Sequence, residues 1–197
     1  LRAIAQRTGL EFEPVRVSRL DQQMAALERD EADVTMLVPT AARARRFRFS
    51  RPFVQTSFGV ITRDVAGGPM TLADLRGKRI ALPASHALKE MLPSATDYQF
   101  VETDTLAAAM KAVTHDRADA TIAFLPMALY YTSVLQDEKL RVSDVAEDAP
   151  AWLAIATRKD QPELASIIDK AMLQIPPDEV DIFQNRWRPR PDASPAT

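Results

Sequence analysis

The sequence predicts an α/β protein built from two lobes of related architecture, and three observations lead to this fold class. Helical and strand patterns alternate along the chain, which is typical of βα units and a mostly parallel sheet. The alternation stops at Gly67-Gly68-Pro69 and then starts again. Residues 26–36 also align without gaps with residues 112–122, each reading as a helix end, a polar turn, Ala-Asp and a strand. Chance similarity between two ordinary helix–turn–strand units is the alternative explanation of the repeat.

The start of the chain predicts a helix, a strand and a second helix. Apolar residues at helical spacing precede Gly9, a natural C-cap. Residues 12–17 carry the apolar pattern of a short strand. Ser18 is the expected N-cap of the next helix, because Asp21 follows at capping-box spacing. The apolar stripe of that helix is Leu20, Met24 and Leu27.

The remaining elements follow from the same periodicities. Residues 33–38 form a buried-type strand, and residues 53–62 are rich in the β-branched and aromatic residues that favour strands. Residues 189–197 are a linker or a free tail, because they are rich in proline and have no periodicity. Later helices are expected at 71–75, 85–92, 104–113, 162–173 and 179–187, and later strands at 78–82, 98–101, 119–123 and 152–157.

Composition excludes several classes of function. The chain has 197 residues, 46% of them hydrophobic and 26% charged, which is an ordinary globular balance. Its net charge of −2 gives no electrostatic reason to expect nucleic acid as a partner. It has no cysteine and two histidines, which argues against thiolate and His-rich metal centres. No catalytic Ser-His-Asp spacing or phosphate loop is present, so no cofactor, metal or catalytic residue is expected.

The two predicted lobes suggest where a ligand would bind. In open α/β sheets, ligands lie beyond the carboxyl ends of the strands. If the lobes face each other, the residues that follow Thr35 and Thr121 line one shared cleft. Residues 37–43 would then form one wall and residues 123–127 the other.

One stretch of the chain resembles a family signature. Thr40-Ala41-Ala42-Arg43, then Phe47, then Phe49-Ser50-Arg51-Pro52-Phe53 resembles the pattern of family 3 extracellular solute-binding proteins. The entry to a strand at 74–78, the 118–120 turn and the ending Arg186-Trp187 agree with it, so the resemblance covers about residues 1–188. Residues 82–85 and the Arg-Trp ending look most like the Venus-flytrap sensor modules of BvgS-like histidine kinases.

This resemblance implies a type II periplasmic binding protein fold with two lobes. Lobe 1 would comprise residues 1–61 and 153–188, and lobe 2 residues 62–152, with crossovers near 59–62 and 151–153. Ligand would close the lobes about these crossovers. Relatives begin with a central lobe 1 strand before the helix that here starts at Leu1. Its absence predicts an unpaired gap that another segment or chain fills, or a partly open lobe.

The resemblance also implies that Arg43 binds a ligand carboxylate, because a planar guanidinium can hold two oxygens at once. The alternative is a solvated arginine in a basic run with Arg45, Arg46 and Arg48. Thr40 is expected to cap the turn that carries Arg43 rather than to touch ligand.

The neighbourhood of Arg43 departs from the amino-acid-binding pattern. Residues 36–39, which include Val38, are mostly apolar, and Thr35 is the only hydroxyl residue just before them. On the other wall, Phe124 stands where amino-acid-binding members carry the Asp that pairs with the α-amino group. A phenylalanine offers an ammonium only a cation–π contact. The expected ligand is therefore a carboxylate with an apolar or aromatic body.

Three further residues complete the candidate site. Ser85 and His86 begin a predicted helix in lobe 2, where free N–H groups favour anions. The alternative is an ordinary Ser N-cap beside an exposed His. Phe53 flanks a crossover, as Phe58 and Trp152 do, and would either stack on ligand or pack in the core.

These observations together predict a periplasmic small-molecule sensing domain of a membrane histidine kinase. The domain itself would not be an enzyme, and a kinase domain would lie elsewhere in the parent protein, which tethers it to the membrane. A homodimer is possible on this hypothesis. The alternatives are the substrate-binding receptor of an ABC-type amino-acid or organic-acid uptake system, and a periplasmic dehydratase on the same fold.

Overall fold

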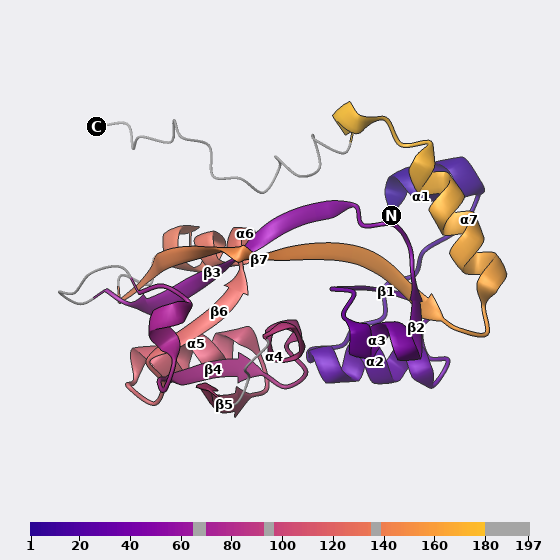
Figure 1. The fold of residues 1–197 in the computed structure, drawn as a ribbon. Helices are drawn as coiled ribbons and strands as arrows, with labels where there is room; N and C mark the ends of the chain where they lie inside the picture. Colours follow the sequence, from indigo (N-terminus) through magenta and orange to yellow (C-terminus); the bar gives the residue numbers. More distant parts are fainter. Residues whose placement is uncertain (65–69, 93–96, 135–138, 180–197) are drawn as a thin grey trace.

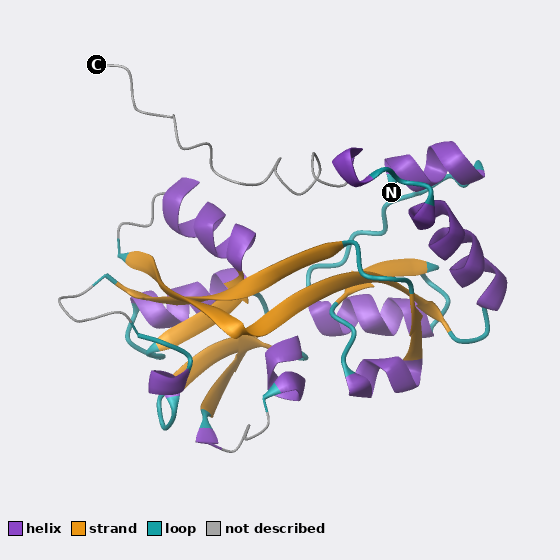
Figure 2. Cartoon of the chain, turned by 45° about the horizontal axis from the view of Figure 1, so that its top comes forward, coloured by secondary structure: helices purple, strands orange, loops and turns teal. Residues whose placement is uncertain are grey.

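The computed structural model describes residues 1–64, 70–92, 97–134 and 139–179. Its strands form one curved sheet that passes through both halves of the molecule (Figures 1 and 2). The strand order is β1-β7-β3-β6-β4-β5, and β2 also pairs with β7. The strands are β1 (Val34–Leu37), β2 (Phe47–Phe49), β3 (Val54–Arg63), β4 (Arg79–Pro83), β5 (Gln99–Thr103), β6 (Ala120–Phe124) and β7 (Leu140–Arg158).

The helices divide between the two halves, which we call the first and second lobe (Figure 1). The first lobe contains α1 (Arg2–Thr8), α2 (Leu20–Glu28), α3 (Ala41–Arg46) and α7 (Pro162–Leu173), with β1 and β2. The second lobe contains the short helix η1 (Ala73–Leu75), α4 (Ala87–Met91), α5 (Leu106–Thr114) and α6 (Leu125–Leu129), with β4, β5 and β6. Among the described residues, no helix is long and apolar enough to span a bilayer.

The long antiparallel strands β3 and β7 connect the lobes (Figure 2). Val54–Ser57 of β3 pair with β7, whereas Phe58–Thr62 pair with both β7 and β6. The pairing of β3 with β7 shifts register between Ser57 and Phe58. Such a bulge bends a strand locally, and here it lies where β3 enters the second lobe. The exact residues that divide the lobes stay a prediction.

Each lobe has its own hydrophobic core. In the second lobe, one cluster contains Phe58, and another, which contains Ile61, packs beneath α5. In the first lobe, α1 and α7 cover one face of the sheet around Ile155, and α2 covers another cluster around Leu37. Because the cores are separate, the lobes can change their relative position without repacking either interior.

The internal repeat has the same backbone conformation in both copies. Asp30 and Asp116, the equivalent residues of the two turns, both adopt left-handed conformations, with φ of 62° and 58°. The amide that follows each of them returns to the helix end in the same way: Glu31 N donates to Ala26 O at 2.9 Å, and Arg117 N donates to Ala112 O at 2.8 Å. Two structurally equivalent helix–turn–strand units therefore stand one in each lobe.

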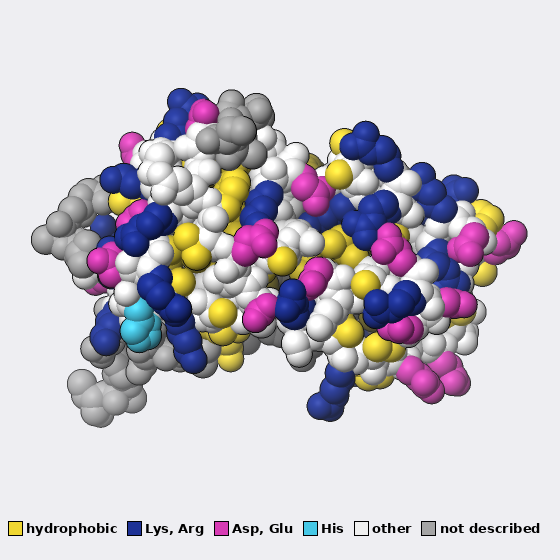
Figure 3. Space-filling view, turned by 90° about the horizontal axis from the view of Figure 1, so that it is seen from below, with side chains coloured by type: hydrophobic (Ala, Val, Ile, Leu, Met, Phe, Trp, Pro, Cys, Tyr) yellow, Lys and Arg dark blue, Asp and Glu magenta, His cyan; other side chains and the backbone are white. Residues whose placement is uncertain are grey.

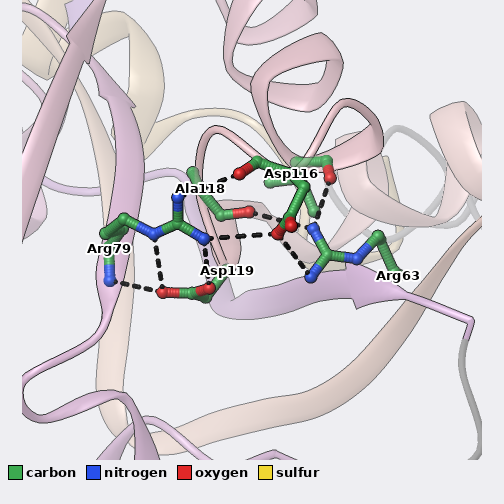
Figure 4. A network of polar contacts seen from close by, with 6 residues as sticks. Arg63, Arg79, Asp116, Ala118 and Asp119 are labelled. Atoms are coloured by element: carbon green, nitrogen blue, oxygen red, sulfur yellow. Dashed lines mark hydrogen bonds and ion pairs between the residues drawn. The ribbon is translucent and has the colours of Figure 1, made fainter.

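Both repeat turns are held by an arginine at the end of a connecting strand. Arg158, the last residue of β7, contacts Asp30 at 2.5 Å in the first lobe. Arg63, the last residue of β3, contacts Asp116 at 3.0 Å in the second lobe (Figure 4). Each arginine also donates to the carbonyl of the Ala two residues after that Asp. Each connecting strand is thus anchored to the turn of the lobe in which it ends.

The second of these turns is part of a larger ion-pair network (Figure 4). Arg79 contacts Asp119 at 2.8 Å and Asp116 at 3.2 Å. The hydrogen bond from Arg79 is the main cause that lowers the pKa of Asp119. Each charge drawn in this network is paired within the second lobe, so we assign it a structural role.

Two local predictions at the start of the chain are wrong. The expected strand at 12–17 is not formed, and residues 9–17 have no regular structure. Within the described residues, β1 pairs only with β7, so its other edge carries no strand. A strand needs a hydrogen-bonding neighbour, and residues 12–17 pair with no strand among the described residues. Ser18 is also not the N-cap of α2: Arg19 takes that position and binds Asp21 through its side chain.

Other expected elements are present with small shifts of their ends. Gly9 ends α1 with a left-handed φ of 74°, as predicted. Thr40 caps α3, accepting a hydrogen bond from Arg43 N at 3.2 Å, as predicted. The predicted strand 152–157 is the end of the longer strand β7. Most of the predicted helix 179–187, Arg186-Trp187 and the tail 189–197 lie outside the described residues.

Candidate functional site

Arg43 lies buried between the two lobes. Its side chain comes from α3, directly after β1, and is only 2% exposed. Nη1 donates to the carbonyl of Val38 at 3.1 Å within the first lobe, and Nη2 donates to the carbonyl of Ser85 at 2.6 Å in the second lobe. The alternative of a solvated arginine is therefore wrong for Arg43. It does hold for its neighbour Arg46, which pairs with Glu28 at the surface.

Glu90 completes the surroundings of Arg43 from the second lobe. Its Oε1 lies 3.4 Å from Arg43 Nε, and its Oε2 accepts a hydrogen bond from the Thr40 hydroxyl. The Glu90 side chain is 27% exposed, so it is only partly removed from water. We call Thr40, Val38, Arg43, Ser85 and Glu90 the Arg43 cluster.

The fork of Arg43 is only partly satisfied. Among the described residues, Nε is buried and has no hydrogen-bond partner, because its contact with Glu90 lacks hydrogen-bonding geometry. Burial lowers the pKa of the Arg43 guanidinium, while the charge of Glu90 opposes that change. A carboxylate placed squarely on the fork would therefore make stronger bonds than Glu90 does here.

Glu90 was not among the predicted site residues. It lies four residues after His86, so the two share one face of the predicted helix 85–92. That spacing is the signal from which its position could have been inferred. A charged residue on a short helix is ordinarily solvated, which is why the signal is weak.

Ser85 contacts Arg43 through its backbone carbonyl, and the charge of Arg43 acts on the ring of His86. Ser85 has a left-handed φ of 63°, uncommon for a residue with a side chain, and this conformation accompanies the contact of its carbonyl with Arg43. The Ser N-cap alternative is wrong, because His86 caps α4: its Nδ1 accepts from Leu88 N at 3.3 Å. Burial, then the charges of Arg43 and Lys89, lowers the pKa of His86 to about 4, so its ring is neutral at pH 7.

A row of three rings adjoins the Arg43 cluster. Phe58, which is fully buried, lies between His86 at 5.6 Å and Phe124 at 5.4 Å, measured between ring centroids. Phe58 and Phe124 are stacked with 14° between their planes. Phe124 ends β6 and begins α6, at the carboxyl end of the strand where the cleft wall was expected. Phe58 is a core residue, so Phe124 and His86 are the partly exposed rings beside the buried cation.

The other predicted residues lie within the first lobe. Thr35 is in β1 opposite Ala156, and its side chain is half-buried. Val38 is buried and joins the cluster through its carbonyl. Phe53 packs against the core of Ile155 and Ile168. The structure thus gathers Arg43, Val38, Ser85, His86 and Phe124 in one region, and ligand contact by any of the predicted residues stays a prediction.

A second polar contact joins the lobes at the surface. Arg19, just before α2, reaches Asp104, just before α5, at 2.5 Å. Charged side chains of both signs are interspersed over the face in Figure 3, so the described side chains on this face form no patch of one sign. Within the described residues, no group of three or more His, Cys, Asp and Glu side chains could hold a metal ion.

Among curated proteins, this chain is similar to two sensor proteins and an amino-acid-binding protein. It is 33% identical over 193 residues to "Virulence sensor protein BvgS" of Bordetella pertussis, which covers 95% of this chain and 15% of that protein. It is 26% identical over 202 residues to "Sensor protein EvgS" of Escherichia coli K12, covering 98% of this chain and 16% of that protein. "Amino-acid-binding protein AabA" of Dichelobacter nodosus is 27% identical over 197 residues, covering 96% and 77%. The chain therefore spans a small part of the sensor proteins that it matches.

Solved structures and a family match agree on the architecture. The periplasmic VFT2 domain of Bordetella pertussis BvgS superposes with a TM-score of 0.85 at 32% identity, covering 95% of this chain and 80% of that one. ArgBP of T. maritima shares the fold with a TM-score of 0.79 at 22% identity, covering 94% and 81%. The α/β, two-lobe Venus-flytrap fold is thus confirmed. Because the family match spans residues 1–190, the chain belongs to the bacterial extracellular solute-binding proteins, family 3.

Proposed function

We propose that this chain is the periplasmic small-molecule sensing domain of a membrane-tethered sensor histidine kinase. The observation that carries this proposal is the Arg43 cluster, in which one buried cation contacts carbonyl groups of both lobes. Similarity to BvgS and EvgS over nearly the whole chain supports a sensor rather than a free receptor. A change in the relative position of the lobes would be the signal passed to the rest of the protein.

The ligand class follows from the chemistry of the site. A carboxylate would take the free Nε–H of Arg43 together with one Nη, the planar geometry that guanidinium favours. The rings of Phe124 and neutral His86, which pack on Phe58 of the core, would hold an apolar or aromatic body. We propose no site for an α-amino group, because Phe124 occupies the position of the expected acidic residue.

The chief alternative is a receptor for amino-acid or organic-acid uptake. Similarity to AabA, of which this chain covers 77%, favours it. The parent gene separates the two functions: a kinase domain in the same protein supports sensing, whereas an isolated binding protein supports uptake. A homodimer stays a prediction that size-exclusion chromatography with light scattering would test.

The experiment is a thermal-shift and calorimetric screen of aliphatic and aromatic carboxylates and amino acids. A ligand at 100 times its dissociation constant stabilises the folded state by about 2.7 kcal/mol. Arg43→Lys keeps the charge but not the fork, so we expect it to abolish most of that stabilisation. Arg46→Lys is the matched control, because Arg46 is on the same helix and pairs at the surface. Equal binding by wild type and Arg43→Lys would refute the assignment of Arg43.

A further inference from the structure

The carboxylate of Glu90 occupies the position that the proposed function gives to a ligand carboxylate. It is on α4 of the second lobe, whereas Arg43 and Thr40 are on the first. Both of its oxygens face the first lobe: one lies 3.4 Å from Arg43 Nε, and the other accepts the Thr40 hydroxyl. An internal carboxylate thus bridges the lobes at the anchor of the site.

We infer that Glu90 is an internal occupant of the Arg43 site, which holds the lobes together without a small molecule and competes with an external carboxylate. The inference rests on the proposed function for Arg43 as the ligand anchor. It adds two points to that function. The lobes close without a ligand, and a ligand acts by displacing Glu90 from Arg43.

Three features of the contact support displacement rather than permanent pairing. The Glu90 side chain is 27% exposed, so it can return to water at little cost, whereas Arg43, at 2% exposure, cannot. The distance of 3.4 Å and the missing hydrogen bond at Nε mark a loose ion pair that a well-placed carboxylate can improve upon. The other second-lobe contact of Arg43 is the neutral carbonyl of Ser85 at 2.6 Å, so displacing Glu90 removes the charged contact and leaves one neutral hydrogen bond.

The charged and titratable groups beside Glu90 leave it free to pair with Arg43. Lys89 points to Glu102, at 2.7 Å, and so belongs to another ion pair within the second lobe. His86 is neutral because its pKa is lowered to about 4. Among the groups described around Arg43, Glu90 is therefore the one anion that faces it from the second lobe.

The test measures the separation of the lobes directly. Because the chain has no cysteine, spin labels can be placed at Lys111→Cys on α5 and Lys170→Cys on α7, both exposed and one in each lobe. Without added ligand, we expect one short distance in wild type and a shift to longer distances in Glu90→Gln. Glu102→Gln is the control, because it makes the same chemical change in the same lobe without touching Arg43.

The possible outcomes decide the matter. The inference is overturned if the distance between the spin labels in Glu90→Gln equals that in wild type. It is also overturned if this distance increases no more than it does in Glu102→Gln. Glu90→Ala removes the carboxylate entirely, and the inference requires its lobes to separate in the same way. This variant replaces Glu90→Gln if the glutamine variant folds poorly. A titration with acetate, followed by the Arg43 Nε–Hε NMR signal, should reach half-saturation at about tenfold lower concentration in Glu90→Gln than in wild type. Equal half-saturation overturns the competition.

Failure of the proposed function would look different. If no carboxylate in the screen binds either protein but Glu90→Gln still opens, the ligand class is wrong and the internal contact stands. If carboxylates bind wild type through Arg43 and Glu90→Gln stays closed, the proposed function stands and the role of Glu90 is wrong.

Discussion

Gly59 allows α6 to pack directly on β3, and a side chain there should disturb the wall that carries Phe124. A Cβ added at Gly59 would lie 3.0 Å from Ala128 Cβ and 3.4 Å from Leu125 Cδ1, both on α6. Carbon atoms prefer separations of about 3.5–4.0 Å. Gly59→Ala therefore requires α6 to move by a few tenths of an ångström or more.

The magnitude follows from the cost of overpacking. The backbone fixes the position of the new methyl carbon, and the Ala128 methyl group that it meets is fully buried, so neither group can move into solvent. Overpacking a dense core costs about 1–3 kcal/mol, and we expect Gly59→Ala to lower the free energy of unfolding by this amount. For a chain of this size that is a fall in the melting temperature of about 2–4 °C per kcal/mol.

A double-mutant cycle measured by urea unfolding isolates the contact. Ala128→Gly removes the opposing methyl group at a helix-propensity cost of about 1 kcal/mol. In the double variant Gly59→Ala/Ala128→Gly, we expect a favourable coupling energy of about 0.5–2 kcal/mol. Additive losses, or a Gly59→Ala variant as stable as wild type, would refute the packing that we describe.

Two further predictions concern titration and the strand anchors. The pKa of His86 falls from an ordinary 6.5 to about 4 on folding, so the unfolded chain binds more protons between these values and stability should fall as pH drops from about 6.5 to 4. The loss should reach at most about 3 kcal/mol, visible in urea midpoints, and His86→Asn should flatten it. Arg158→Gln should cost about 1–2 kcal/mol by freeing Asp30 and the Ala32 carbonyl, and Arg63→Gln a similar amount through the equivalent turn. If Arg158→Gln has the same melting temperature as wild type, Arg158 does not anchor the end of β7 to the Asp30 turn.

The order of elements and the repeat could be predicted because their signals are local. Periodicity located β3, β6 and α5 to within a few residues, and the repeat predicted two turns that share one backbone conformation. The prediction of a strand at 12–17 was wrong because a strand forms only beside a hydrogen-bonding partner strand, which periodicity does not reveal.

The centre of the candidate site was harder to predict, since its contacts join distant parts of the chain. The family resemblance singled out Arg43, whereas composition alone made it one more member of a basic run, and only tertiary structure shows its contacts with Val38 and Ser85. Glu90 looked like a solvated residue of a short helix. Its importance comes from the approach of α4 to α3, which no local pattern encodes.

The most direct test of the proposed site is the side-chain NMR signal of Arg43. The Nε–Hε signal, assigned by its loss in Arg43→Lys, should shift in proportion to binding when a carboxylate that stabilises the protein is titrated in. The signal of the surface control Arg46 should stay in place. A carboxylate that binds and stabilises the protein while the Arg43 signal does not move would contradict the placement of the ligand site between the lobes.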